Sequence, residues 1–432
     1  SDRIHTKSMD KFVIQGRKAL GGEIEARGAK NAAFPLLAAT ILTTEDCVIS
    51  NLPLIEDVYR SIEILQSMGA TVEWLEERTV KVNTKDLNPA TLNRDLVLKL
   101  RGSVLFAGPL LARFGQVNLP QPGGDVIGAR PINTHLDAFS QLGVSVEPHN
   151  GFHMEFKGNL KKKEVVLSEF SVTATENLLL FASVFEGPIT IKIADQDYQV
   201  QELMAVLSKM GVLFHTPQLH MIIIEGKKNL KGFSHRLMYD PIEAGTFVLL
   251  GAATGGNIIV KNVEFRFLDL FFKKLQDSKI AFDIVRAQEG VGDVKILPSP
   301  DMVIDKIQSW IYPGVHSDLQ SAFGVLATQT PGSTLLHDPL YEGRLRYLEE
   351  LTKMGAEIYF ADPHRAIING PSKLYGTNLG AFDLRGGAAL IIAALIAEGT
   401  STISNIYQVD RGYEKIEERL GKLGADMTRV TV

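Results

Sequence analysis

The sequence predicts an α/β fold with two inside-out, barrel-like α/β domains, each made of three repeated α/β units whose helices are buried inside a shell of strands. Three observations support this fold class. The chain has 432 residues, which is too long for one small core and favours two domains. A helix ending in glycine recurs at intervals of about 70 residues, as in repeat architectures. A second set of helices is apolar around the whole circumference, which is typical of helices buried inside a domain.

The first repeated element is a helix end that runs straight into a short strand. Each clear copy has an apolar residue, then a glycine, then the strand, and the glycine is expected to cap the helix with a positive φ. The copies lie at residues 68–72, 142–146, 210–214, 354–358 and 423–427, with a degenerate copy at 277–280. Six units of this size fill the chain.

The second repeated element is an apolar helix followed by a strand. It is expected within residues 34–50, 103–119, 176–193, 245–260, 320–336 and 388–403. Six units divide most simply into three and three. The segment 229–243, which is loop-like and contains Gly232 and Pro241, is the expected boundary between the domains. A ligand cleft is expected between them.

Composition argues against several classes of function. A net charge of −5 gives no sign of a nucleic-acid or membrane partner. Cys47 is the only cysteine, so the chain has no internal disulfide and no thiolate metal cluster, and its histidines lack metal-ligand spacing. The longest apolar run, 388–397, is too short to span a bilayer, and residues 1–8 lack an apolar signal-peptide core. We expect a cytoplasmic-type soluble protein without a metal, and the oligomeric state stays open.

Residues 121–131 are expected to form a mobile loop that exposes its backbone, because a Pro-Gly-Gly run suits neither a helix nor a strand. In the middle of this loop lies a carboxylate, Asp125, and five residues later a cation, Arg130. An acid beside a fixed cation on a flexible loop is the arrangement that a lid carrying a proton donor needs. The alternative is a solvated surface turn.

Three cations stand where the repeats place the starts of buried helices. They are Lys30, which precedes Asn31, then Arg101 and Arg385. The start of a helix offers unpaired N–H groups and a positive dipole end, which suit phosphate or carboxylate ligands. A cation at that end is unfavourable for the helix itself, so an anionic ligand explains these residues better than helix stability does. A purely structural role is the alternative.

Other charged residues lie in expected loops. Arg130, Arg344 and Arg411 come from different repeats, and Asp318 follows a Pro-Gly turn at the start of the fifth buried helix. Each has an ordinary explanation: arginines are common on solvated surfaces, and a first-turn acid stabilises a helix. The chain contains no Gly-rich phosphate loop followed by Lys and Ser or Thr, no dinucleotide fingerprint and no serine-nucleophile elbow.

Five motifs together give the chain a resemblance to the enolpyruvyl transferases. They are Gly28-Ala29-Lys30-Asn31, the loop 122–131, Asp318-Leu319-Gln320, Asp383-Leu384-Arg385 and Asp410-Arg411-Gly412-Tyr413. The chain is most similar to members that use UDP-N-acetylglucosamine, over essentially all residues from 9 onward, and less similar to those that use shikimate 3-phosphate. The resemblance implies two inside-out domains, with residues 30–238 in one and residues 1–29 and 239–432 in the other.

The resemblance implies transfer of the enolpyruvyl group of phosphoenolpyruvate to the 3′-hydroxyl of UDP-N-acetylglucosamine, with release of phosphate and without a cofactor. This reaction begins peptidoglycan precursor synthesis. By resemblance, Lys30, Arg130 and Arg411 hold the phosphate of phosphoenolpyruvate. Arg344 and Arg385 hold its carboxylate, for which the planar guanidinium is well suited.

The acid–base and acceptor residues follow from the same resemblance. Asp318 accepts the proton of the hydroxyl, with Asp383 close by, and Arg101 contacts the diphosphate. The resemblance thus implies a catalytic set of Asp125, Asp318, Lys30 and Arg411. The positions that it assigns to substrate binding are Asn31, Arg101, Arg130, Pro131, Asn133, His135, Ser171, Val172, Thr173, Arg344, Asp383 and Arg385.

The general acid departs from the family pattern, because most members carry Cys where this chain has Asp125 and only a minority carry Asp. A carboxyl group there must stay partly protonated near neutral pH, which burial on lid closure favours and the neighbouring Arg130 opposes. A carboxylate is not alkylated as a thiolate is. The substitution therefore predicts resistance to fosfomycin, the epoxide that modifies the Cys of the family.

The uridine end departs as well. Asn133 stands in place of an Asp that reads uracil, Glu169 in place of a Lys, and Thr173 in place of a Gly. Residues 194–199 replace an Ala-Arg-Glu-Pro-Glu segment, and Gly343 replaces the Asn of Glu-Asn-Arg. These changes leave two alternatives open: an enolpyruvyl transferase with a different acceptor, or a catalytically idle relative that binds ligand. The retention of Asp125 and Asp318 argues against idleness, because a pure binder needs neither an acid nor a base.

Overall fold

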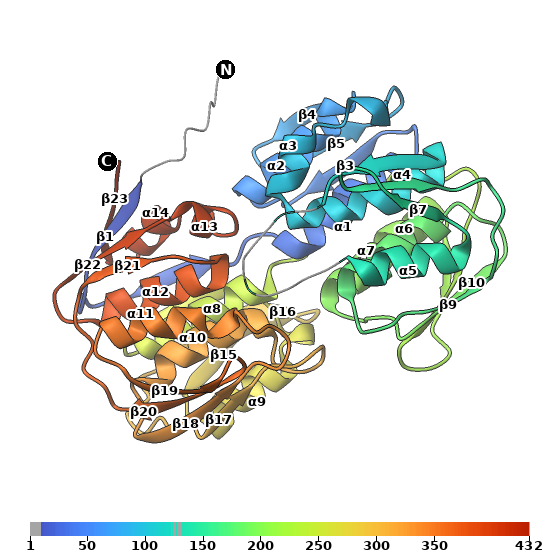
Figure 1. The fold of residues 1–432 in the computed structure, drawn as a ribbon. Coiled ribbons are helices and arrows are strands. Elements are labelled where there is room, and N and C mark those ends of the chain that lie inside the picture. The colour runs from blue at the N-terminus through green and yellow to red at the C-terminus, as the bar shows by residue number, and fades with distance from the viewer. Residues whose placement is uncertain (1–9, 122, 124–126, 128–131, 432) are drawn as a thin grey trace. The chain divides into compact units, whose positions relative to one another are not determined.

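The computed structural model describes residues 10–121, 123, 127 and 132–431 (Figure 1). These residues form two compact units. We call the stretch from Gly28 to Met238, apart from Ile127, the N-terminal unit. The C-terminal unit contains the chain up to Arg27, Ile127 and everything from Tyr239 onward. The predicted Asp125, Arg130 and Pro131 lie outside the described residues.

The N-terminal unit contains three buried helices, one from each repeat. They are α1 (Lys30–Ala39), α4 (Ala107–Phe114) and α6 (Val172–Ala182). Short 3-10 turns extend α1 and precede α4: η1 (Thr40–Leu42) and η3 (Arg101–Phe106). The other helices of the unit are α2 (Glu56–Ser67), η2 (Pro89–Thr91), α3 (Arg94–Lys99), α5 (Asn133–Leu142) and α7 (Tyr198–Met210).

Three sheets belong to the described part of the N-terminal unit. The first has the order β13 (Ser234–Arg236), β3 (Cys47–Ser50), β5 (Thr79–Asn83), β4 (Thr71–Glu76). The second has the order β6 (Gln116–Leu119), β8 (Phe152–Glu155), β7 (Ser145–Pro148). The third has the order β11 (Leu213–His215), β12 (Met221–Glu225), β10 (Pro188–Lys192), β9 (Glu164–Val166).

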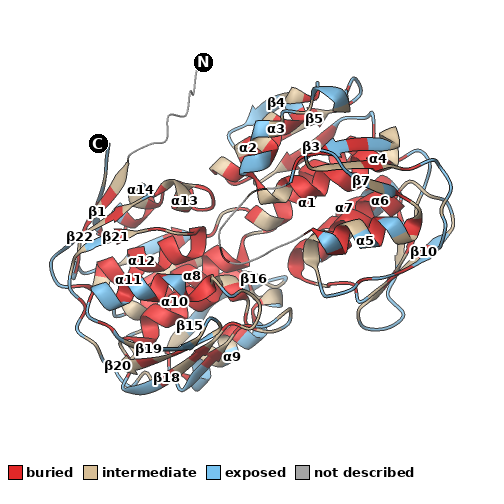
Figure 2. Cartoon of the chain, in the orientation of Figure 1, coloured by how far each residue is buried: buried red, intermediate tan, exposed pale blue. Residues whose placement is uncertain are grey.

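The C-terminal unit repeats the plan with α8 (Pro241–Ala253), α10 (Ser317–Ala327) and α12 (Leu384–Ile396) as its buried helices. These three helices pack against one another, and nearly every residue of α8 and α12 is buried (Figure 2). The remaining helices are η4 (Phe265–Phe267), α9 (Asp269–Asp277), η5 (Arg344–Arg346), α11 (Tyr347–Lys353), α13 (Tyr407–Asp410) and α14 (Ile416–Gly421).

The sheets of the C-terminal unit include two strands from the start of the chain. One sheet has the order β21 (Asn378–Gly380), β22 (Thr400–Ser404), β1 (Lys11–Gln15), β23 (Asp426–Val430). Another has the order β15 (Phe282–Gln288), β16 (Val291–Ile296), β14 (Ile258–Glu264), β2 (Gly22–Glu25). The last has the order β17 (Lys306–Gln308), β18 (Gly332–His337), β20 (Arg365–Gly370), β19 (Glu357–Asp362).

The four-stranded sheets share one pairing pattern. The strand after each buried helix, such as β10 or β18, pairs parallel with one neighbour and antiparallel with the other. Alternate residues of β1, β5, β12 and β22 are buried, so each of these strands turns one face inward. Figure 1 shows β17–β20 on the outer side of α10 and α12. The predicted α/β fold with repeated units and buried helices is confirmed.

The predicted glycine caps are also confirmed. Gly143 and Gly211 end α5 and α7 with φ of 105° and 112°. At the degenerate copy Lys279 takes the same role with φ of 55°, which costs a side chain about 1 kcal/mol relative to glycine.

Two details differ from expectation. The segment 229–243 is not all loop, since it holds β13 and the first turn of α8. The second buried helix begins as the 3-10 turn η3 before it continues as α4. Within the described part of the chain, none of the helices has the length and apolar character needed to cross a membrane.

Candidate functional site

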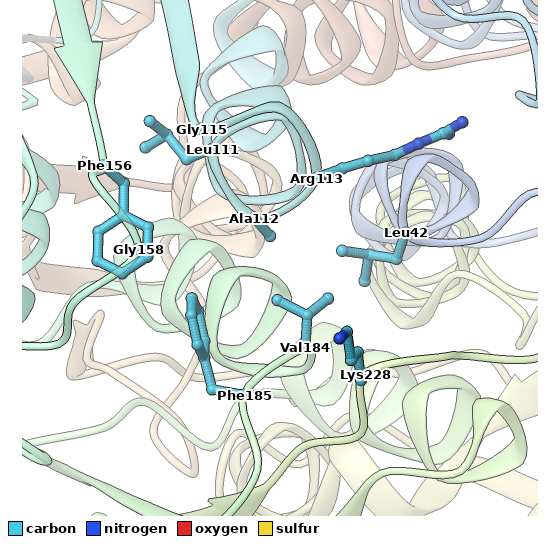
Figure 3. Close-up of a pocket in the computed structure, with 10 residues that line it drawn as sticks. All are labelled: Leu42, Leu111, Ala112, Arg113, Gly115, Phe156, Gly158, Val184, Phe185 and Lys228. Atoms are coloured by element: carbon cyan, nitrogen blue, oxygen red, sulfur yellow. The ribbon is translucent and has the colours of Figure 1, made fainter.

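The three buried helices of the N-terminal unit run in the same direction. Leu42 at the end of η1, Arg113 near the end of α4 and Val184 just after α6 all line one pocket of about 410 Å³ (Figure 3). This pocket holds none of the predicted site residues. The starts of these helices therefore lie together at the opposite end of the unit, where their unpaired N–H groups favour anions. Lys30 and Arg101 are found at these starts.

Lys30 is buried and ion-paired. Its Nζ lies 3.0 Å from Oδ2 of Asp57, a buried acid in the first turn of α2. This partner offsets the unfavourable position of a cation at the start of α1. Next to it, Asn31 Nδ2 donates to the hydroxyl of Tyr198 at 3.2 Å. The start of α1 is thus held by side chains from both α2 and α7.

His135 belongs to a buried network between α5, η3 and α6. Asn177 has a defined amide orientation, because its Oδ1 accepts from Gly108 N at 2.8 Å and its Nδ2 donates to Val104 O at 2.8 Å. The same Nδ2 lies 2.9 Å from His135 Nδ1, which must therefore accept. His135 Nε2 then carries the hydrogen and donates to Thr173 Oγ1 at 3.0 Å.

The protonation state of His135 agrees with this tautomer. Burial first, and Arg101 second, lower the pKa of His135 to about 3, so the ring is neutral at neutral pH. Both ring nitrogens are engaged inside the protein, and the side chain therefore supports the start of α6 at Thr173. The predicted Ser171 is the N-cap of this helix, accepting from Ala174 N at 3.2 Å, and Val172 is the first residue.

Asn133 and Glu169, two of the positions at which the sequence departs from the family pattern, are exposed. Glu169 Oε1 accepts a hydrogen bond from Thr134 Oγ1 at 2.7 Å. The charge reversal at residue 169 therefore has a local structural partner on α5.

A buried carboxyl group lies near this end of the unit. Glu176 in α6 is 0% exposed. Burial raises the pKa of Glu176 well above its ordinary value, and the neighbouring Asp195 and Asp197 raise it further, while Gln199 offsets this in part. Glu176 is therefore neutral over a pH range in which an exposed glutamate is charged.

In the C-terminal unit, Asp318 joins two predicted arginines. Its Oδ1 accepts from Arg344 Nη2 at 2.7 Å, and its Oδ2 accepts from Arg385 Nε at 3.0 Å. Arg344 and Arg385 are each 3% exposed. Three residues from the loops and helix starts of two repeats therefore form one charged cluster.

Further groups fix the two guanidinium groups. Arg344 Nε donates to Ser317 Oγ at 3.1 Å, and its Nη1 lies 3.5 Å from Asp383 Oδ2. Asp383 is also the N-cap of α12, accepting from the backbone N–H of Arg385 at 3.0 Å. Burial lowers the pKa of Arg344, but Asp318, Asp383 and Asp338 together raise it above its ordinary value. Arg344 therefore stays charged despite being buried.

Arg385 has a second partner in Tyr413. Its Nη1 donates to the Tyr413 hydroxyl at 3.2 Å, and that hydroxyl also lies 3.1 Å from Thr246 Oγ1 on α8. All three buried helices of the unit therefore contribute to holding this cluster.

Arg411, after α13, is 4% exposed and donates to Gln408 at 3.0 Å. Ile127, which belongs to this unit, accepts at its carbonyl from Gly343 N at 2.8 Å.

Sequence reasoning missed the residues that position the predicted ones. These are Asp57, Ser317, Asp338 and Tyr413. Only Tyr413 carried a signal, since it lies in the Asp410-Arg411-Gly412-Tyr413 motif. Among the described residues no group of three or more His, Cys, Asp or Glu side chains could hold a metal ion.

Comparison with protein families identifies the family of this chain. The family model of EPSP synthase (3-phosphoshikimate 1-carboxyvinyltransferase) matches residues 14–420. The chain belongs to the EPSP synthase family of enolpyruvyl transferases. Two of the most similar curated relatives of this enolpyruvyl transferase both bear the name UDP-N-acetylglucosamine 1-carboxyvinyltransferase. The protein from Treponema denticola is 40% identical over 422 residues, covering 96% of this chain and 98% of the relative. The protein from Bradyrhizobium diazoefficiens is 38% identical, covering 97% and 98%.

Solved structures agree on the fold of the family. The enolpyruvyl transferase NikO from Streptomyces tendae superposes with a TM-score of 0.88 at 24% identity, over 98% of this chain and 100% of its own. An EPSP synthase from Acinetobacter baumannii gives a TM-score of 0.77 at 17% identity, with the same coverage. At these identities the likeness establishes the fold of this enolpyruvyl transferase.

Proposed function

We propose that this enzyme transfers the enolpyruvyl group of phosphoenolpyruvate to the 3′-hydroxyl of UDP-N-acetylglucosamine with release of phosphate, the first step of peptidoglycan precursor synthesis. The observation that carries the proposal is the cluster in which Asp318 accepts from both Arg344 and Arg385. It combines a proton acceptor with two buried guanidinium groups suited to a carboxylate. The names of relatives that match nearly the whole chain support the choice of acceptor.

The anionic ends of phosphoenolpyruvate go to separate groups of cations in this proposal. The carboxylate binds Arg344 and Arg385 of the C-terminal unit. The phosphate binds Lys30, Arg130 and Arg411. Each buried cation is held by a protein acid or amide before substrate arrives, as Lys30 is by Asp57, so the ligand meets a preorganised charge.

Asp318 changes partners during this binding. In the described protein both of its oxygens accept from guanidinium groups. In this proposal the incoming carboxylate binds the remaining terminal nitrogen of Arg385, Nη2. As phosphoenolpyruvate engages Arg344 and Arg385, Asp318 gives up part of its hydrogen bonding and becomes able to accept the proton of the sugar hydroxyl. Asp383 stays in place as the cap of α12 and keeps Arg344 oriented.

Asp125 donates the proton to C3 of phosphoenolpyruvate in this proposal, in place of a cysteine thiol. Fosfomycin resistance follows, because the remaining candidate for alkylation is poor: Cys47 is the single cysteine, it is fully buried, and burial raises its pKa to about 12. Time-dependent inactivation of the enzyme by fosfomycin at modest concentration would contradict this part of the proposal.

A different acceptor is the second candidate, because the sequence departs from the family pattern at the residues expected to contact the uridine. Glu169 replaces a cation and is bound to Thr134, and Asn133 replaces an acid. These changes favour an enolpyruvyl transferase whose acceptor differs from UDP-N-acetylglucosamine in its nucleoside. Calorimetric titration with UDP-N-acetylglucosamine and with other nucleoside diphosphate sugars distinguishes the two, since the true acceptor is expected to bind most tightly.

The deciding experiment measures phosphate release from phosphoenolpyruvate with and without UDP-N-acetylglucosamine. We expect release that depends on the acceptor and is lost in Asp125→Asn. If the folded enzyme binds phosphoenolpyruvate but releases no phosphate with this acceptor, the acceptor is wrong. If Asp125→Asn turns over normally, the assignment of the acid is wrong.

A further inference from the structure

A buried hydroxyl–carboxylate pair lies directly behind Arg344. We infer that Ser317 and Asp338 are positioning residues, which orient the Arg344 guanidinium toward the carboxylate of phosphoenolpyruvate. The inference rests on the proposed function and adds two residues to it, neither of which contacts the reacting atoms.

The pair is inaccessible and closely bonded. Asp338 is 0% exposed and Ser317 is 3% exposed. Ser317 Oγ donates to Asp338 Oδ2 at 2.6 Å, and Arg344 Nε donates to Ser317 Oγ at 3.1 Å. The chain of contacts therefore runs from a buried carboxylate through one hydroxyl to the inner edge of the guanidinium.

The direction of each hydrogen bond in this chain is determined. Asp338 can only accept, so the single hydroxyl hydrogen of Ser317 points to Asp338. The lone pairs of Ser317 Oγ then face Arg344, whose Nε–H can only donate. A guanidinium fixed at Nε has its plane set, and its two terminal nitrogens then face Asp318 and Asp383.

Asp338 is itself immobilised. Its other oxygen, Oδ1, accepts from the backbone N–H groups of Leu340 and Tyr341, each at 3.1 Å. These bonds fix the start of the turn that leads to Arg344, and the Tyr341 ring lies under the guanidinium with its centroid 5.2 Å away. Asp338 thus orients Arg344 in two ways, through Ser317 and through the backbone of the turn.

The neighbouring acid explains why such positioning matters. Asp383 also attracts Arg344, but at 3.5 Å its contact is long, and its Oδ2 already accepts from two backbone N–H groups of α12. Without the bond to Ser317, Arg344 is expected to turn toward Asp383 and away from the ligand. The expected defect is therefore specific to the carboxylate of phosphoenolpyruvate.

The test compares Ser317→Ala and Asp338→Asn with matched controls. Asparagine keeps the shape of Asp338. Its amide NH2 group, however, then faces one of the hydrogen-bond donors from which the Asp338 carboxylate accepts. The controls are Ser401→Ala, another fully buried serine whose Oγ has no hydrogen-bond partner among the described residues, and Asp293→Asn, another buried acid that accepts from a backbone N–H. Steady-state constants for both substrates, calorimetric affinity for phosphoenolpyruvate and the urea midpoint are measured for each.

We expect the KM and Kd for phosphoenolpyruvate to rise about 10-fold in Ser317→Ala and about 10- to 100-fold in Asp338→Asn, from the loss of one hydrogen bond to a charged group or more. The KM for the acceptor should stay within about twofold, since the lost bond does not touch the acceptor. Both controls should leave the affinity for phosphoenolpyruvate unchanged. A rise in both KM values, or a loss that merely follows the urea midpoint across all four variants, overturns the inference.

A double-mutant cycle identifies the route of action. Lysine has no counterpart of Nε, so Ser317→Ala should add no further loss of phosphoenolpyruvate affinity in an Arg344→Lys background. Full additivity overturns the inference. If the wild type binds no phosphoenolpyruvate, both the inference and the proposed function fail. If it binds phosphoenolpyruvate but does not use UDP-N-acetylglucosamine, only the acceptor fails, and the binding measurements still decide the inference.

Discussion

Replacing Arg385 by lysine tests the carboxylate clamp most directly. The Arg385 guanidinium donates from Nε to Asp318 and from Nη1 to Tyr413, at 3.0 and 3.2 Å. The lysine side chain is shorter and carries a single ammonium group. It can keep at most one of these two hydrogen bonds, and it cannot form a forked pair of hydrogen bonds with a carboxylate. The charge is retained, so any loss reports geometry.

The size of the effect follows from those contacts. A hydrogen bond involving a charged group contributes about 1.5 to 3 kcal/mol, and the variant loses one fork bond to the ligand. We therefore expect kcat/KM for phosphoenolpyruvate to fall by about 10- to 150-fold. Tyr413 keeps its contact with Thr246, so the stability loss should be moderate, about 1 to 2 kcal/mol.

Arg419→Lys is the matched control. Arg419 is also a buried arginine of the C-terminal unit, and its Nη1 donates to the buried Glu243 at 2.6 Å. It should lose similar stability in urea unfolding while the KM for phosphoenolpyruvate stays at the wild-type value. The reasoning is refuted if Arg385→Lys keeps kcat/KM within about twofold of wild type, or if both variants lose it equally.

Three further outcomes are expected. Asp125→Cys should make the enzyme sensitive to time-dependent inactivation by fosfomycin, to be followed by residual phosphate release; continued resistance would contradict a role for residue 125 in alkylation. Glu176→Gln should be more stable than wild type, by a margin that grows by up to about 1.4 kcal/mol per pH unit above the ordinary glutamate value. The reason is that the folded wild type keeps a proton that the unfolded chain releases as pH rises; a margin independent of pH in urea unfolding would disprove this. Asp57→Asn should lower the affinity for phosphoenolpyruvate by about 10-fold, because Lys30 loses the partner that orients it; unchanged calorimetric affinity would show that the pair is only structural.

Much of the fold could be predicted because its signals are local. Gly143 and Gly211 take the left-handed conformation at the ends of their helices, as the repeat signature implied. The apolar helices are buried on all sides, as in α8 and α12. The 3-10 start of the second buried helix was not predicted.

The candidate site was predictable in part. The residue types at the helix starts indicated an anion site, and Asp318, Arg344 and Arg385 do form one cluster. The expected loop residues Asp125, Arg130 and Pro131 stay predictions, as do the ligand cleft between the domains and the roles of the individual residues. Asp338 gave no signal, because an aspartate before a turn is common and its link to Arg344 passes through a third residue.

The sequence by itself determined the repeated units, the buried helices and the cations at their starts, because helical periodicity and capping are properties of short stretches of chain. Only the tertiary structure decided which charges meet. Asp318 and Arg385 are 67 residues apart in the chain, and Lys30 meets Asp57 on another helix. Such contacts depend on how repeats pack against one another, and so do the tautomer of His135 and the neutral state of Glu176, which burial and neighbouring groups set together.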